Sequence, residues 1–174
     1  SLVFLIKLKV FLFFLKPVLT TTSFSINYFF QKMSSAITFS IIIPFKTWSL
    51  DLEENLVHLR EQTLKKFEII LLPDVETTLP DIYLDLPIFI YSTGEVNPAL
   101  KRDFGAKKST GKYLAFIDDD AYPQSDWLEV ALNALENRND ISAIGGPAIT
   151  PKNDPFWAKV FGAIFLSNFS GGFK

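Results

Sequence analysis

Three consecutive aspartates, Asp118, Asp119 and Asp120, directly follow the apolar run at residues 113–117. Carboxylates this close together raise one another's pKa unless a cation compensates them. Mg²⁺ and Mn²⁺ prefer oxygen ligands, and Mg²⁺ commonly takes one or two carboxylates together with substrate phosphates. Because alternate residues of an extended chain point the same way, Asp118 and Asp120 are predicted to share a metal site. An isolated aspartate triplet is more often a solvated acidic turn, and the position after a buried strand is what favours the metal site.

Asp74 occupies a similar position, next to Pro73 at the end of the apolar run at residues 67–72. It is either a turn residue that ends a strand or an acceptor for a ring N–H or ribose hydroxyl of a nucleotide. Lys101 and Arg102 offer two neighbouring cations that could reach a diphosphate. Taken alone, that pair is more simply a solvated helix face.

The composition removes several other kinds of chemistry. The 174 residues are 48% hydrophobic and 21% charged, which indicates one folded domain rather than a disordered chain. The absence of cysteine excludes disulfides and thiolate chemistry, and His58 is the single histidine, which disfavours a Ser-His-Asp triad. A formal charge of −2 disfavours nucleic acid as a partner. Neither Gly-x-Gly-x-x-Gly nor a P-loop follows the first predicted strand, which argues against a dinucleotide-binding dehydrogenase and a P-loop nucleotidase.

Alternating strands and helices must position these residues. Strands are predicted at 39–43, 67–72, 88–91, 113–117 and 141–145, each bounded by turn residues. Helices are predicted at 51–64, from an Asn97 cap to Gly111, and after a Ser125 cap. This order predicts an α/β fold with a mostly parallel, Rossmann-like sheet flanked by helices. Ligands of such sheets bind at the carboxyl ends of the strands, where the aspartates lie.

The two ends of the chain differ from its middle. Residues 1–32 contain Lys7, Lys9, Lys16 and Lys32 and no acidic residue, and the single methionine follows at Met33. Three interpretations of this apolar, basic leader stay open: a non-native extension upstream of Met33, a membrane anchor, or a secretory signal. The apolar stretch at 156–169 is either a core helix or an amphipathic element lying on a membrane. We expect the domain at 38–174 to be truncated at its C-terminus.

Four segments in register resemble family 2 glycosyltransferases over residues 38–150. They are Ser40-Ile41-Ile42-Ile43-Pro44, then Phe67 to Asp74, then Lys101-Arg102-Asp103-Phe104-Gly105-Ala106, and Leu114 to Asp120 followed by Ala121-Tyr122-Pro123. The resemblance implies the nucleotide-sugar-binding part of a GT-A fold. It further implies a nucleotide-diphospho-sugar donor, Mg²⁺ or Mn²⁺, an inverting mechanism, and a glycan or lipid-linked acceptor.

Carried over by position, the resemblance also implies roles for individual residues. The expected donor-binding residues are Pro44, Phe45, Lys46, Asp74, Arg102, Asp118 and Asp119, and the expected metal ligands are Asp118 and Asp120. The expected location is the cytoplasm, and a further option is association with the inner face of the cell membrane.

The resemblance also implies an acidic catalytic base, which in this family lies well beyond the Asp-x-Asp pair. No acidic residue follows Asp154 in this sequence, which ends at Lys174. The catalytic residue is therefore not assigned within the sequence, and the base is expected beyond Lys174. We expect a chain that binds a nucleotide sugar without turning it over.

Two other classes of protein remain as alternatives. A sugar nucleotidyltransferase shares the α/β architecture, but it would carry a glycine-rich basic signature after the first strand, where Pro44-Phe45-Lys46-Thr47 stands. A non-catalytic, magnesium-binding α/β module would place its acidic pair after the first strand rather than the fourth. The sequence has neither the glycine-rich signature nor an acidic pair after the first strand, and it therefore favours the transferase.

Overall fold

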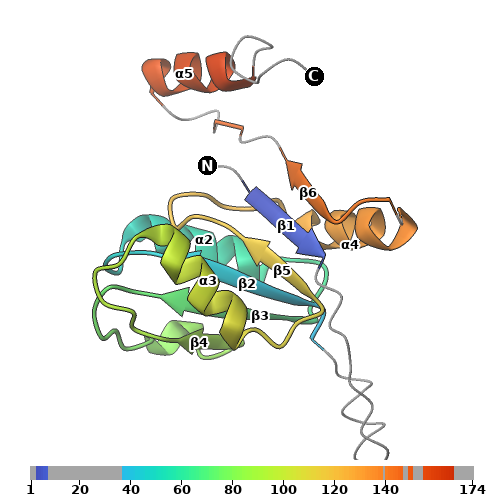
Figure 1. Cartoon of the computed structure of the whole chain (residues 1–174). Helices are drawn as coiled ribbons and strands as arrows, with labels where there is room; N and C mark the ends of the chain where they lie inside the picture. The colour runs from blue at the N-terminus through green and yellow to red at the C-terminus, as the bar shows by residue number, and fades with distance from the viewer. Residues whose placement is uncertain (1–2, 8–36, 139, 147–148, 151–154, 167–174) are drawn as a thin grey trace, which may run out of the picture.

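The computed structural model describes residues 3–7, 37–138, 140–146, 149–150 and 155–166. Its centre is a six-stranded sheet with strand order β4-β3-β2-β5-β1-β6 (Figure 1). Four neighbouring strands run parallel: β4 (Ile88–Ile90), β3 (Phe67–Leu72), β2 (Phe39–Pro44) and β5 (Tyr113–Phe116). Beyond them, β1 (Val3–Lys7) pairs antiparallel with β5 and with β6 (Ala143–Gly146). The predicted α/β fold with a mostly parallel sheet is confirmed.

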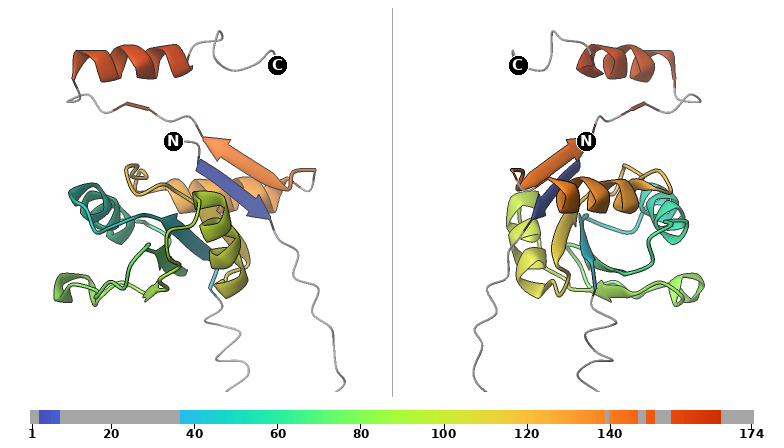
Figure 2. Two further views of the ribbon diagram at one scale, coloured as in Figure 1. Left: turned by 60° about the vertical axis from the view of Figure 1, so that its left-hand side comes forward. Right: turned by 90° about the vertical axis from the view of Figure 1, so that its right-hand side faces the viewer.

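Successive side chains of the neighbouring strands β2 and β3 point to opposite faces of the sheet, and they divide the core into two layers. All six residues of β2 and all six of β3 are buried, as expected for strands covered on both faces. Ile41 and Ile43 face one layer, where α2 (Leu50–Arg60) and α4 (Trp127–Asn137) pack. Ile42 faces the other layer, which is covered by α3 (Pro98–Lys108), as Figure 2 shows. Each of these isoleucines contributes about 1.5–3 kcal/mol by leaving water.

Of the helices α2, α3 and α4, the first two begin at a residue whose side chain caps the helix N-terminus. Ser49 accepts a hydrogen bond from the Leu52 N–H at 3.1 Å and begins α2. Asn97 accepts one from the Leu100 N–H at 2.9 Å and begins α3, as predicted. The predicted Ser125 cap of α4 is wrong, because Asp126 is the cap residue and the Ser125 carbonyl instead accepts the Thr63 N–H.

Two predicted helix ends lie further along the chain than the observed ones. Helix α3 ends at Lys108 because Ser109 is extended, with φ −67° and ψ 142°, so Gly111 is not its C-terminal stop. Gly111 instead passes close to β2: a Cβ atom there would lie 2.6 Å from the Ser40 nitrogen. Helix α2 ends at Arg60, before the predicted limit at residue 64. A short 3-10 helix, η1 (Asp81–Tyr83), lies between β3 and β4.

Only part of the N-terminal leader falls within the described residues. The sequence did not predict strand β1, which lies in register with β5 so that Phe4 is opposite Phe116. Residues 8–36, which include most of the leader and Met33, lie outside the described part, so the three interpretations of that leader stay open.

The C-terminal stretch is described as far as helix α5 (Phe156–Leu166), which exposes Phe156 and Trp157. Residues 167–174 lie outside the described part, and with them the end of the chain at Lys174. The expected truncation of the domain and the expected catalytic base beyond Lys174 therefore stay predictions. Across the described residues, no helix combines the length and the apolar character needed to cross a membrane.

Candidate functional site

The loops that follow β2, β3 and β5 meet at one edge of the sheet. The Phe45 N–H donates to the Leu72 carbonyl at 3.2 Å, and the Asp74 N–H donates to the Lys46 carbonyl at 3.1 Å. On the other side of β2, the Ile117 N–H donates to the Ile42 carbonyl at 3.3 Å. These bonds continue the parallel ladders past the strand ends. The edge therefore collects the loops that carry Lys46, Asp74 and the aspartate triplet.

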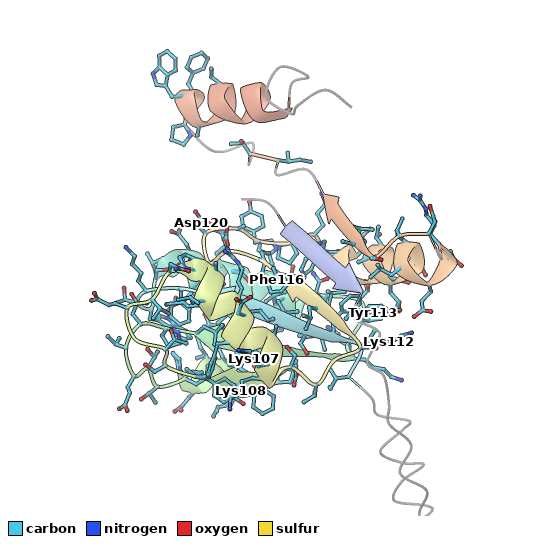
Figure 3. All side chains as sticks on the ribbon, in the orientation of Figure 1. Lys107, Lys108, Lys112, Tyr113, Phe116 and Asp120 are labelled. Carbon is cyan, nitrogen blue, oxygen red and sulfur yellow. The ribbon has the colours of Figure 1, made fainter. Side chains whose placement is uncertain are left out.

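The aspartate triplet lies in a tight turn. The Ala121 N–H donates to the Asp118 carbonyl at 3.2 Å, so the chain reverses at Asp119 and Asp120. Strand β5 ends before the triplet, so the alternation of side chains along an extended strand does not apply to Asp118 and Asp120, and their shared metal site stays a prediction. Figure 3 shows Asp120 beyond the carboxyl end of β5, with Lys112 and Tyr113 at the opposite end of that strand.

Asn55, on α2, forms hydrogen bonds with the backbone of this turn. Its side chain is fully buried, and its Nδ2 donates to the Asp118 carbonyl at 3.0 Å and to the Ala121 carbonyl at 2.5 Å. Asn55 is not among the site residues expected from the sequence. The available signal was its position between Leu52, Leu56 and Leu59 on the buried face of the helix, because a buried amide has to find hydrogen-bond partners.

Arg102, on α3, forms an ion pair with Asp118. The two side chains are 33% and 31% exposed, so the pair lies at the solvent edge of the site rather than in the core. Burial raises the pKa of Asp119; a hydrogen bond to its own backbone opposes that rise, and the negative charges of Asp120 and Asp118 add to it. The turn is thus a concentration of negative charge that Arg102 offsets only in part.

Lys101, the neighbour of Arg102, behaves differently from both predictions made for it. It is 2% exposed, so it is neither a solvated residue nor a cation free to reach a diphosphate. Its Nζ donates to the carbonyls of Phe45 and Leu72, the latter at 3.0 Å, and forms an ion pair with Asp74. One turn further along α3, Gly105 is also buried. Residues four apart lie on the same face of a helix, so the position of Lys101 relative to Gly105 was the sequence signal that Lys101 faces inward.

The segment Pro44 to Lys46 presents its backbone more than its side chains to this edge. Pro44 and Phe45 are buried, and the Phe45 ring packs against Trp48 with a centroid distance of 6.4 Å. Lys46 alone of these three is exposed. A ligand at this edge would therefore meet the Lys46 side chain and not the Phe45 ring.

The donor set at the turn suits a hard divalent cation that takes its remaining ligands from elsewhere. Among the described residues, no group of three or more His, Cys, Asp or Glu side chains is arranged to hold a metal ion. Asp118 and Asp120 would supply two carboxylates at most. Mg²⁺ is commonly bound by one or two carboxylates and completed by water and substrate phosphates, so these residues fit such an ion when a diphosphate is present.

Comparison with solved structures defines the class of fold. The chain resembles the crystal structure of S. aureus TarS residues 1–349 in complex with UDP-GlcNAc, with a TM-score of 0.52 and 23% identity. The alignment covers 57% of this chain and 31% of that one. The fold is therefore the GT-A, Rossmann-like fold of glycosyltransferases.

Sequence comparison then gives the family. The family model described as Glycosyl transferase family 2 matches residues 40–171, and the chain belongs to that family. An uncharacterized glycosyltransferase of Rickettsia felis is 33% identical over 110 residues, which cover 59% of this chain and 18% of the relative. The amylovoran biosynthesis glycosyltransferase AmsB of Erwinia amylovora is 30% identical over 109 residues, which cover 58% and 36%.

The family match confirms the resemblance inferred from the four segments. It favours the transferase over the nucleotidyltransferase and over the magnesium-binding module. The chain spans less than half the length of each of these relatives.

Proposed function

We propose that this chain forms the donor-binding part of a glycosyltransferase that uses a nucleotide-diphospho-sugar. The observation that carries the proposal is that the loops after β2, β3 and β5 bring Asp74 and the aspartate triplet to one edge of the sheet, where Arg102 of helix α3 pairs with Asp118. That edge is where ligands of parallel α/β sheets bind. Support also comes from TarS, whose structure holds UDP-GlcNAc on the same fold.

The residues at this edge have complementary tasks in the proposed reaction. Asp118 and Asp120 would hold Mg²⁺ or Mn²⁺, which offsets the negative charge that develops on the departing diphosphate. Arg102 orients Asp118 through their ion pair and adds positive charge beside the phosphates. Asp74 accepts hydrogen bonds from the base or ribose, and the Asp119 carboxylate accepts a further hydrogen bond from the nucleotide sugar. The backbone of Pro44, Phe45 and Lys46 borders the nucleotide.

We propose that the acceptor hydroxyl attacks the anomeric carbon directly, which inverts its configuration. A glycan or a lipid-linked sugar is the proposed acceptor, and the base that deprotonates its hydroxyl is proposed to lie beyond Lys174. Two relatives support the choice of acceptor by name: AmsB acts in amylovoran biosynthesis, and a relative in Haloferax volcanii is a glucosyl-dolichyl phosphate glucuronosyltransferase. We place the reaction in the cytoplasm, at the inner face of the membrane when the acceptor is lipid-linked.

Calorimetric titration of the chain with nucleoside diphosphates tests the proposal. We expect UDP or GDP to bind in the presence of Mn²⁺ and to bind much more weakly after the metal is removed with EDTA. UMP and GMP, which carry the same bases without a diphosphate, are the matched controls and should bind weakly under both conditions. If neither diphosphate binds with Mn²⁺ present, or if EDTA leaves their affinity unchanged, the proposed metal-assisted donor site is wrong.

A further inference from the structure

Lys101 lies beneath the candidate site and has no place in the roles proposed above. Its ammonium group contacts three acceptors: the carbonyl of Phe45 just after β2, the carbonyl of Leu72 at the end of β3, and the carboxylate of Asp74 in the loop after β3. Two of the three N–H donors of this ammonium go to the carbonyls, and its charge faces the Asp74 carboxylate. With 2% of its surface exposed, Lys101 cannot also contact a ligand.

Burial of a charged lysine is unfavourable unless the charge is paired and hydrogen-bonded. Here the pairing carboxylate belongs to Asp74, which lies in the loop after β3. Asp74 Oδ1 is itself buried and accepts no hydrogen bond of good geometry among the described residues, so the Lys101 charge is what compensates it. Each of these two buried groups therefore compensates the charge of the other.

We propose that Lys101 is a positioning residue that fixes Asp74 and the Phe45–Lys46 segment for nucleotide binding. This inference rests on the proposed function, because it assigns Lys101 to the same donor site. The two carbonyl contacts hold the β2 and β3 loops at a fixed separation, and the ion pair sets the direction of the Asp74 carboxylate. The second carboxylate oxygen of Asp74 is then directed by a buried charge rather than by the ligand.

Hydrogen exchange tests this role without any ligand. We compare the wild-type chain with Lys101→Gln, which keeps a donor for the carbonyls but loses the charge, and with Lys107→Gln, an exposed position on the same helix. In Lys101→Gln the amides of Phe45 and Asp74 should exchange about tenfold faster or more, while amides in the middle of β2 and β5 keep their rates. Unchanged exchange at Phe45 and Asp74 overturns the proposal, and so does equal acceleration across the whole sheet, which would indicate a general loss of stability.

A double-mutant cycle on nucleotide affinity tests whether Lys101 influences nucleotide binding through Asp74. Lys101→Gln should weaken binding of the nucleoside diphosphate about tenfold in the wild-type background and have no further effect in Asp74→Asn. Additive losses overturn the claim that Lys101 acts through Asp74. If the wild-type chain binds no diphosphate, the proposed function fails by itself, whereas the exchange experiment still decides whether Lys101 fixes the two loops.

Discussion

Arg102 and Asp118 form an ion pair that connects helix α3 to the turn after strand β5. Arg102 approaches from the side of the sheet covered by α3, whereas Asn55 holds the same turn from α2 on the opposite side. The acidic turn is therefore supported through both faces of the sheet. This support keeps a cluster of like charges in one conformation despite their mutual repulsion.

Replacing Arg102 by methionine separates the role of the ion pair in binding from its role in folding. Both partners are about one third exposed, so solvent screening limits their contribution to the free energy of unfolding to about 1 kcal/mol or less. Affinity for a nucleoside diphosphate with Mn²⁺ should nevertheless fall about tenfold, because a charge beside the phosphates is lost. Urea unfolding and calorimetry give the two quantities, and Lys107→Met is the control. A large loss of stability with unchanged affinity would contradict this prediction.

Asparagine at position 118 or 120 keeps the shape of the side chain and removes its charge. We expect each substitution to reduce Mn²⁺-dependent nucleotide affinity about tenfold or more, since carboxylate is the better ligand for a hard cation. In EDTA the two variants and the wild type should bind with the same weak affinity. Asp103→Asn, on an exposed position of α3, is the control and should behave as wild type. Loss of affinity that persists in EDTA would mean that these carboxylates do not act through a metal.

Asn55→Ala removes the two hydrogen bonds that support the acidic turn. The carbonyls of Asp118 and Ala121 then lose their buried donor, and we expect the free energy of unfolding to fall by about 2–4 kcal/mol. Glu54→Ala, the exposed neighbour on the same helix, should change it by less than about 0.5 kcal/mol. Urea denaturation of the two variants provides the comparison, and equal stabilities would show that Asn55 does not support the turn.

Gly105→Ala tests how closely α3 must approach the sheet. A Cβ atom at position 105 would lie 2.7 Å from Ile42 Cγ2 and 2.9 Å from Leu72 Cδ1, which is too close for either buried side chain. Overpacking of this kind costs about 1–3 kcal/mol and outweighs the gain of about 1 kcal/mol in helix propensity. Thermal unfolding should show a lower midpoint than wild type. A midpoint above wild type would mean that the helix moves outward without penalty.

Asp85 provides a prediction about acid. Its carboxylate accepts hydrogen bonds from the Arg60 guanidinium at 2.8 Å, and these bonds hold the pKa of Asp85 below its usual value of 3.8. A lowered pKa in the folded state means that the pair stabilises the fold above about pH 4 and that this contribution disappears as the pH falls through the folded pKa. In Arg60→Met, carbon NMR of the Asp85 carboxyl should show its pKa returning upward. An unchanged pKa would exclude Arg60 as the cause.

The sequence predicted those features that depend on local pattern. The buried runs at β2 and β3 and the Asn97 cap of α3 follow from residue types and their spacing, and the order of the elements predicts the parallel sheet with the aspartates at its carboxyl edge. The turn at Asp118 could not be predicted in the same way. It depends on Asn55, which is far away in the sequence and whose contacts exist only after α2 has packed.

Lys101 illustrates a second limit. A lysine next to an arginine on a helix ordinarily indicates a solvent-facing surface, because buried lysines are rare. What overrides that expectation is the presence of three acceptors beneath the helix, contributed by the ends of β2 and β3. No local window of sequence contains both the lysine and its acceptors.

The inward orientation of Phe45 has a consequence for comparing relatives of this chain. Because its ring fills space beside Trp48 and its carbonyl accepts from the buried Lys101 ammonium, residue 45 is constrained by the volume of its side chain. We therefore expect another bulky apolar residue at position 45 of a relative to leave the proposed donor site unchanged. Within this segment, Lys46 is then the residue whose side chain is free to differ between relatives, because it alone of the three reaches the solvent.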